Sequence, residues 1–150
     1  MEGNENVARL LKKVWVMGNE IAPAAFTLRP NIYETYISVL RENVSTFQID
    51  ALEIAHGRAV KYASINTRDL TGKTDILFSE KTTYSVKPID NEKYKSHAGI
   101  FIAINGHNIV GGEPFEKYLR QKGVAEDILL ISIAEQLAHL AQKSIKTIKQ

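Results

Sequence analysis

Short apolar runs separated by turn residues fill the middle of the chain, residues 58–110, and restrict the possible folds more than any other feature. Asn105-Gly106 stands between two of these runs, and Asn-Gly in that position is the strongest short-range signal for a β-hairpin. Strands joined by such tight turns pair in antiparallel fashion. The segment therefore predicts a mainly antiparallel sheet. The runs are Arg58–Ile65, Asp75–Ser79, Tyr84–Ile89, His97–Ile104 and His107–Val110.

Helical patterns lie on both sides of these runs. Glu5–Met17 has apolar residues at the i, i+3, i+4 and i+7 spacing of an amphipathic helix. Ala125–Lys149 carries an unbroken apolar stripe, with acidic residues first and lysines last, as the helix dipole favours. A further helix is expected to open around Gly111–Pro114 and to end at Gly123, since proline suits the first helical position. One helix is thus predicted before the runs and two after them.

A strand and a helix are predicted between residues 33 and 57. Tyr33–Arg41 is rich in Tyr, Ile, Val and Thr and is too short for a typical helix, so we expect a strand. Ser45–Gln48 matches a capping box, which predicts a helix over about Thr46–His56 that Gly57 ends. Ile49 is expected on its inward face.

The order of these elements is not a strict alternation of strand and helix. It indicates the α+β class: a single mainly antiparallel sheet of about five to six strands, helices packed on one face, and a long C-terminal helix. The chain has 150 residues, of which 44% are hydrophobic and 24% charged, as is typical of one globular domain. No repeat or linker interrupts it, so we expect residues 1–150 to form a single domain.

Composition excludes several classes of function. The chain has no cysteine, so it has no disulfide, no thiolate zinc site, no iron–sulfur cluster and no cysteine nucleophile. Basic and acidic residues nearly balance, 19 against 17, which argues against a protein that holds nucleic acid mainly by charge. No apolar run reaches the roughly 18 residues that span a membrane, and the polar, acidic start is unlike a secretory signal. We therefore expect a cytoplasmic protein.

One histidine stands out by its context. His97-Ala98-Gly99-Ile100-Phe101-Ile102 resembles the histidine-bearing strand of the NlpC/P60 cysteine peptidases. Because those enzymes need a cysteine thiolate, the resemblance does not carry peptidase activity to this chain. His97 remains a candidate general base or anion ligand. The alternative is a strand-end histidine bonded to a backbone carbonyl.

Two arginines complete the candidate catalytic set. Arg41 ends one predicted strand and Arg58 begins the next, so we expect both at the same rim of the sheet. Paired guanidinium groups there can clamp a carboxylate or phosphate. The same side chains can instead pair with acidic neighbours, Glu42, Glu53 or Asp69.

Three further residues are candidates for ligand binding. Arg29 belongs to the same group of arginines, and His107 follows the Asn-Gly turn at a distance from His97. Gly112 precedes a predicted helix whose first amides can face an anion, although Glu113 would repel phosphate. No histidine or carboxylate pair has metal-ligand spacing, so we expect neither a metal ion nor a cofactor.

Three segments, Leu28–Pro30, Ile37–Arg41 and Ser96–Ile100, are similar to an uncharacterised family of small bacterial α+β domains. The resemblance implies a bacterial, cytoplasmic origin and no particular activity.

The leading hypothesis for function is a non-enzymatic binding or interaction domain that associates with itself or with a partner protein. It rests on the predicted C-terminal helix, in which Ile128, Leu129, Ile131 and Ile133 flank the main apolar stripe. A helix with this much apolar surface is expected to be covered by a deep cleft or by another chain. One alternative is a hydrolase or transferase that uses His97 with the two arginines. Another is weak nucleic-acid binding through aromatic residues of the strands, although core packing explains those residues better. No membrane partner is expected.

Overall fold

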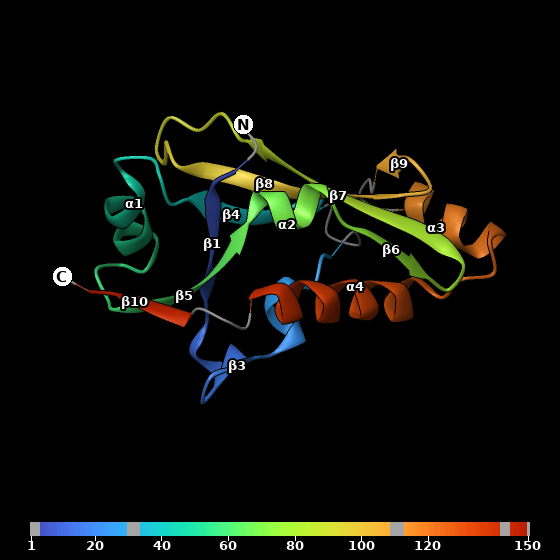
Figure 1. Ribbon diagram of the computed structural model, residues 1–150, viewed down its shortest axis with the longest axis horizontal. Helices are drawn as coiled ribbons and strands as arrows, with labels where there is room; N and C mark the ends of the chain where they lie inside the picture. The colour runs from blue at the N-terminus through green and yellow to red at the C-terminus, as the bar shows by residue number, and fades with distance from the viewer. Residues whose placement is uncertain (1–3, 30–33, 109–112, 142–144, 150) are drawn as a thin grey trace.

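An antiparallel sheet forms the frame of the protein. The computed structural model describes residues 4–29, 34–108, 113–141 and 145–149 (Figure 1). In these ranges the sheet has eight strands in the order β10-β5-β1-β4-β8-β7-β6, and β9 pairs with β8. The predicted class is confirmed, with more strands than expected. The strands are β1 (Asn6–Leu11), β4 (Ile37–Arg41), β5 (Val60–Asn66), β6 (Thr74–Leu77), β7 (Glu80–Pro88), β8 (His97–Ile104), β9 (His107–Asn108) and β10 (Ile145–Ile148).

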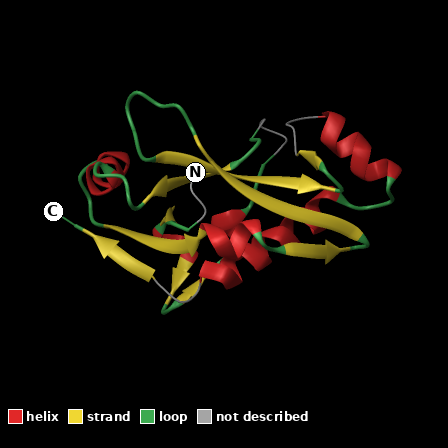
Figure 2. Ribbon diagram, turned by 45° about the horizontal axis from the view of Figure 1, so that its top comes forward, coloured by secondary structure: helices red, strands yellow, loops and turns green. Residues whose placement is uncertain are grey.

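The other elements surround this sheet. Figure 2 shows the strands as a strongly twisted sheet with helices against its middle and at both ends. A separate hairpin is formed by β2 and β3. The bounds are β2 (Val16–Met17), β3 (Glu20–Ile21), α1 (Phe47–Ile54), α2 (Thr67–Thr71), α3 (Glu113–Gln121), α4 (Glu126–Ala141) and the 3₁₀ helices η1 (Lys13–Trp15) and η2 (Pro23–Phe26).

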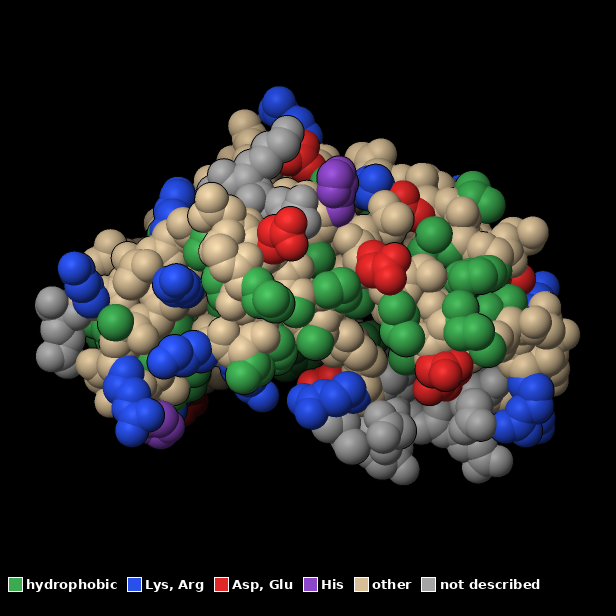
Figure 3. Space-filling view, turned by 90° about the horizontal axis from the view of Figure 1, so that it is seen from below, with side chains coloured by type: hydrophobic (Ala, Val, Ile, Leu, Met, Phe, Trp, Pro, Cys, Tyr) green, Lys and Arg blue, Asp and Glu red, His purple; other side chains and the backbone are tan. Residues whose placement is uncertain are grey.

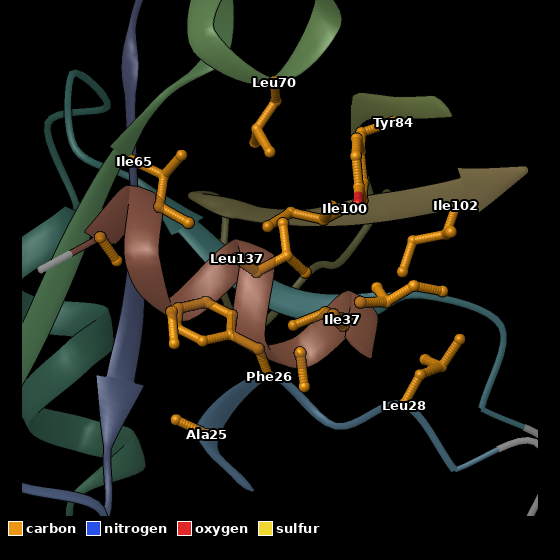
Figure 4. Close-up of a cluster of buried hydrophobic side chains, with 14 of the residues drawn as sticks. Ala25, Phe26, Leu28, Ile37, Ile65, Leu70, Tyr84, Ile100, Ile102 and Leu137 are labelled. Atoms are coloured by element: carbon orange, nitrogen blue, oxygen red, sulfur yellow. The ribbon is translucent and has the colours of Figure 1, made fainter. Parts of the chain in front are cut away.

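The main core lies between one face of the sheet and α4. Alternation along β8 directs Ala98, Ile100, Ile102 and Ile104 into this core. Figure 4 shows Leu137 of α4 beside Ile100, with Phe26 of η2 next to it. All three side chains are fully buried. Their burial fixes both α4 and η2 against the sheet, because each side chain loses apolar surface to water only in this arrangement.

A second, smaller core covers the opposite face, so the expectation that helices pack on one face only is wrong. Phe47 and Ala51 of α1 pack there against Ala8, Leu40 and Tyr62. The reason is that β1, β4 and β5 carry apolar residues at consecutive positions, which point to opposite faces of a strand. Both faces of these central strands therefore need cover.

The predicted helix over Glu5–Met17 is wrong. The segment forms β1, η1 and β2 instead. In a strand, Val7 and Leu11 face the main core while Ala8 and Leu10 face the second one. All four side chains therefore pack in a hydrophobic core. A central strand that is apolar on both faces can imitate helical spacing.

The predicted C-terminal helix is too long. α4 ends at Ala141, and Ile145–Ile148 form β10, which pairs with β5. Ile148 is buried in the second core, against α1 and β5, a position that a continuing helix on the other face of the sheet would not reach. Residues 142–144, between the two, lie outside the described residues.

The remaining expectations are largely confirmed. The predicted middle strands correspond to β5, β6, β7 and β8, and α3 ends before Gly123, whose φ of 72° suits glycine. The predicted strand Tyr33–Arg41 is β4, which begins at Ile37; Tyr33 lies outside the described residues. The helix over Thr46–His56 is α1, but Ile49 faces solvent. The Ser45–Gln48 capping box is wrong, because the N-cap is Thr46 and it makes no side-chain cap bond. Its Oγ1 donates to Asp50 Oδ2 instead.

Two isoleucines of α4 test the main core. Ile133 is 1% exposed and Ile131 is 49% exposed. We expect Ile133→Ala to lower the free energy of unfolding by about 2–5 kcal/mol, because it leaves a cavity in the core. Ile131→Ala, the same change on the same helix, is the control and should cost less than about 1 kcal/mol. Urea unfolding monitored by circular dichroism measures both values. Equal losses in the two variants would contradict this packing of α4.

Candidate ligand pocket between β1 and β4

β1 and β4 are neighbours in the sheet but pair only at Val7 with Arg41 and at Ala8 with Leu40. β1 pairs with β5 along all of its residues, and β4 pairs with β8 from Ile37 onward. Beyond Ala8 the two strands follow different partners and separate. A pocket of about 690 Å³ lies at this opening. We call it the β1–β4 pocket.

The Arg9 side chain crosses the opening. Its Nε donates a hydrogen bond to the Ala25 carbonyl at 2.8 Å, and its Nη1 donates to the Ser38 carbonyl at 2.9 Å. Burial lowers the pKa of Arg9, and the charge of Arg29 acts in the same direction, opposed by Glu34. A guanidinium nevertheless stays protonated in proteins. Arg9 is therefore a partly buried cation whose hydrogen-bond partners in the described residues are neutral carbonyls.

Arg29 and Glu34 pair with each other at the same pocket. Arg29 Nη2 lies 3.0 Å from Glu34 Oε2, and the Arg29 Nε and backbone N–H both donate to Oε1. Burial alone would raise the pKa of Glu34, but the hydrogen bonds and charge of Arg29 lower it overall. The carboxylate is thus ionised and held by Arg29. Within the described part of the chain, no salt bridge joins it to Arg9.

The lining of the β1–β4 pocket is amphipathic. Near Arg9 it is polar, and a second pocket of about 290 Å³ shares Arg9, Thr27, Glu34 and Ser38 with it. Trp15 lies beside this end, with its ring centre 5.4 Å from Arg9 Cζ and 5.1 Å from Lys12 Nζ, both within the range of a cation–π contact. The apolar lining residues are Ala8, Leu10, Leu11, Trp15, Ala24, Val39, Leu40, Ile54, Ala55 and Val60.

The candidate base His97 makes a different set of contacts. Its Nε2 lies 2.9 Å from Ser38 Oγ, and its Nδ1 lies 3.4 Å from Asn91 Nδ2. Asn91 Oδ1 accepts the backbone N–H groups of Lys93 and Tyr94, which turns its amide nitrogen toward the imidazole. Nδ1 is then the acceptor, so Nε2 carries the proton and donates to Ser38. A base that activates this hydroxyl needs the opposite tautomer.

The two candidate catalytic arginines do not lie together. Arg41 Nε donates to Glu5 Oε1 at 2.8 Å, and this bond to Glu5 raises the pKa of Arg41. Arg41 stands opposite Val7, whereas Arg58 precedes β5, whose Lys61 stands opposite Leu11 at the other end of β1. The expectation that Arg41 and Arg58 share one rim is therefore wrong. β1 runs between β4 and β5, which the sequence did not indicate.

The other candidates are placed as follows. Arg29 lines the β1–β4 pocket. His107 is exposed on β9, with its ring centre 5.1 Å from that of Tyr118. Gly112 lies outside the described residues. Of the aromatic residues weighed for stacking, Tyr62 and Tyr84 are buried.

Sequence reasoning missed Arg9, the central residue of the pocket. The available signal was a single charge in the middle of the apolar run Val7–Leu11. If the run is a helix, Arg9 lies on its solvent-facing side; if it is a central strand, Arg9 is a partly buried cation.

Among the described residues, no cluster of His, Asp and Glu side chains is arranged to hold a metal ion, and no helix has the length and apolar character needed to cross a membrane. Comparison of the chain with protein-family models, curated proteins and solved structures found no match.

The burial of His97 has a consequence for stability. Burial lowers the pKa of His97 in the folded protein. As the pH falls through about 6.5, the unfolded chain therefore takes up a proton before the folded one does. The stability that neutral His97 contributes is complete above this pH and is lost as the pH falls toward the folded-state pKa.

We therefore expect the unfolding free energy to fall more steeply between about pH 7.5 and pH 5.5 in the natural protein than in His97→Gln, which does not titrate there. His139→Gln, at an exposed position of α4, is the control. Urea titrations at both pH values give the comparison. An identical pH dependence in the natural protein and His97→Gln would disprove the claim that burial lowers the pKa of His97.

Proposed function

We propose that this chain is a non-enzymatic binding domain that holds a small organic anion in the β1–β4 pocket. The observation that supports this most is Arg9. Transfer of a charge out of water is unfavourable unless an opposite charge or hydrogen bonds compensate it. Two carbonyls, the Trp15 ring and the charge of Glu34 compensate part of it, and a bound anion would add charge-assisted hydrogen bonds.

The lining indicates how such a ligand would lie. Its anionic group would face Arg9 and the smaller pocket, and its apolar part would lie against Leu10, Ile54 and Val60. A volume of about 690 Å³ is within the roughly 300–1,000 Å³ of small-molecule sites. The proposed ligand class is a carboxylate with one aromatic or medium-length aliphatic group.

The alternative of a hydrolase or transferase has less support. It needs His97 free to accept a proton and two arginines beside it. His97 Nε2 instead donates to Ser38, Arg41 is paired with Glu5, and Arg58 is at the other end of β1.

The cytoplasmic location of the protein stays a prediction.

Trp15 provides the readout of the main proposal, since it is the only tryptophan of the chain and lines the pocket. We expect octanoate or phenylacetate to change its fluorescence with saturation. In Arg9→Met the affinity should fall about 30-fold, because the loss of a charge-assisted hydrogen bond costs about 2 kcal/mol. Arg68→Gln, an exposed arginine of α2, is the control and should bind like the natural protein.

A second variant leaves Arg9 in place. Ala55→Phe narrows the apolar end of the pocket and should weaken phenylacetate binding by at least tenfold, since the ring would compete for the same space. Circular dichroism confirms folding of each variant. Saturable binding that neither Arg9→Met nor Ala55→Phe changes would place the ligand elsewhere and overturn the proposal.

Association of two copies is a second candidate function, favoured by exposed apolar residues near a free strand edge. Ile128 and Ile131 of α4, Ile76 of β6 and Phe78 are exposed, and Figure 3 shows hydrophobic side chains across the centre and right of the face that α4 occupies. In the described chain β6 pairs only with β7. Its outer edge offers unpaired backbone groups, which a second β6 can satisfy about a twofold axis. Of the four α4 residues expected to need a second surface, Leu129 and Ile133 are buried. The exposed apolar surface of α4 is therefore smaller than the sequence predicts.

Sedimentation velocity tests this association. We expect a concentration-dependent dimer, weakened at least tenfold by Ile76→Glu, because the dimer would have to bury a charge. Ile49→Glu, at an equally exposed position of α1, is the control. A monomer at all concentrations, or equal effects of both substitutions, would contradict the β6 interface.

A further inference from the structure

The most exposed hydrophobic side chains lie together at one tip of the molecule. Val14 is 80% exposed and Met17 is 78% exposed, more than any other large hydrophobic residue described. They flank Trp15 in the segment Lys12–Ile21, which comprises η1 and the β2–β3 hairpin. We call this segment the basal hairpin. Figure 1 shows it extending below α4 as the lowest point of the molecule.

Basic residues lie at the start of the basal hairpin and on the two strands beside it. Lys12 and Lys13 begin it, and both are exposed. Lys61 of β5 stands opposite Leu11, next to Lys12, and β10 brings Lys146 to the neighbouring position opposite Tyr62. One acidic residue opposes them within the hairpin, since Glu20 faces Met17. Figure 3, viewed from the side to which the hairpin extends, shows Lys and Arg concentrated on the left, over the end of the sheet that carries β10.

This combination fits a lipid surface better than a protein partner. A stable protein interface needs roughly 1,000 Å² of matched surface, and a protruding tip with two exposed aliphatic side chains does not supply it. A bilayer accepts a small apolar tip without matched shape. Tryptophan favours the interfacial zone, and each lysine near an anionic leaflet gains electrostatic attraction.

We propose that the basal hairpin docks the protein on an anionic lipid bilayer. Val14 and Met17 enter the interfacial region, and Lys12 and Lys13 contact the lipid headgroups. Lys12 and Trp15 also line the β1–β4 pocket, so the pocket lies next to the docked surface. The docking itself does not depend on ligand binding in that pocket.

Vesicle co-sedimentation of the full chain tests the docking. Vesicles of phosphatidylcholine with about 30% phosphatidylglycerol should bind the protein, and vesicles of phosphatidylcholine alone should bind it at least tenfold less. The double variant Val14→Ser with Met17→Ser should lower the partition coefficient at least tenfold, because it removes the apolar contact. Lys12→Gln with Lys13→Gln should lower it at least tenfold at low salt.

The control removes an exposed aliphatic residue elsewhere, with Ile49→Ser on α1. It should bind vesicles like the natural protein, as should Arg9→Met, which separates docking from the proposed ligand. Brominated lipids should quench Trp15 fluorescence. Absence of vesicle binding, equal binding to neutral vesicles, or an equal loss in Ile49→Ser would overturn the proposal. Binding to a single-stranded oligonucleotide in place of vesicles would also overturn it, by assigning the lysines to a different partner.

Discussion

The unequal pairing of β1 with its two neighbours is the constraint on which the candidate site depends. β1 follows β5 along its whole length and leaves β4 after two residues. Two strands that separate inside a sheet leave backbone groups that need other partners. The Ser38 carbonyl finds one in Arg9. The opening that creates the pocket therefore also brings a cation into it.

Packing on the main core holds the other side of this site. η2 lies against α4, where Phe26 and Ala25 are fully buried with Leu137. Because η2 is held in this way, the Ala25 carbonyl is presented to Arg9 Nε. The long apolar face of α4 thus contributes to the position of a guanidinium that it does not contact through any described bond. Changes in that packing are expected to reach the pocket through η2.

The charged and polar groups fall into two sets. Several are satisfied within the fold: Glu5 pairs with Arg41, Glu34 with Arg29, and buried Asp50 accepts both the N–H and the hydroxyl of Ser96. Such groups stabilise the structure and have little capacity left for a ligand. Arg9, which donates to two carbonyls, and the lysines of the basal hairpin form the second set, whose members make no salt bridge among the described residues. The two binding proposals use only members of this second set.

Local patterns determined the strands between residues 58 and 104, α1 and α3, because turn residues, alternation and helix-ending glycines act over a few neighbours. Arg29 was also identified as a candidate from sequence. The N-terminal strand, the end of α4 and the burial of Asp50 were decided by tertiary structure. The apolar residues of Val7–Leu11 fit both the helical spacing and the two-residue alternation of a strand, and only the pairing of this segment with β5 and β4 makes it a strand. Arg9 became a site residue because Ala25 and Ser38, distant in sequence, meet it where two strands part, and no local signal encodes that meeting.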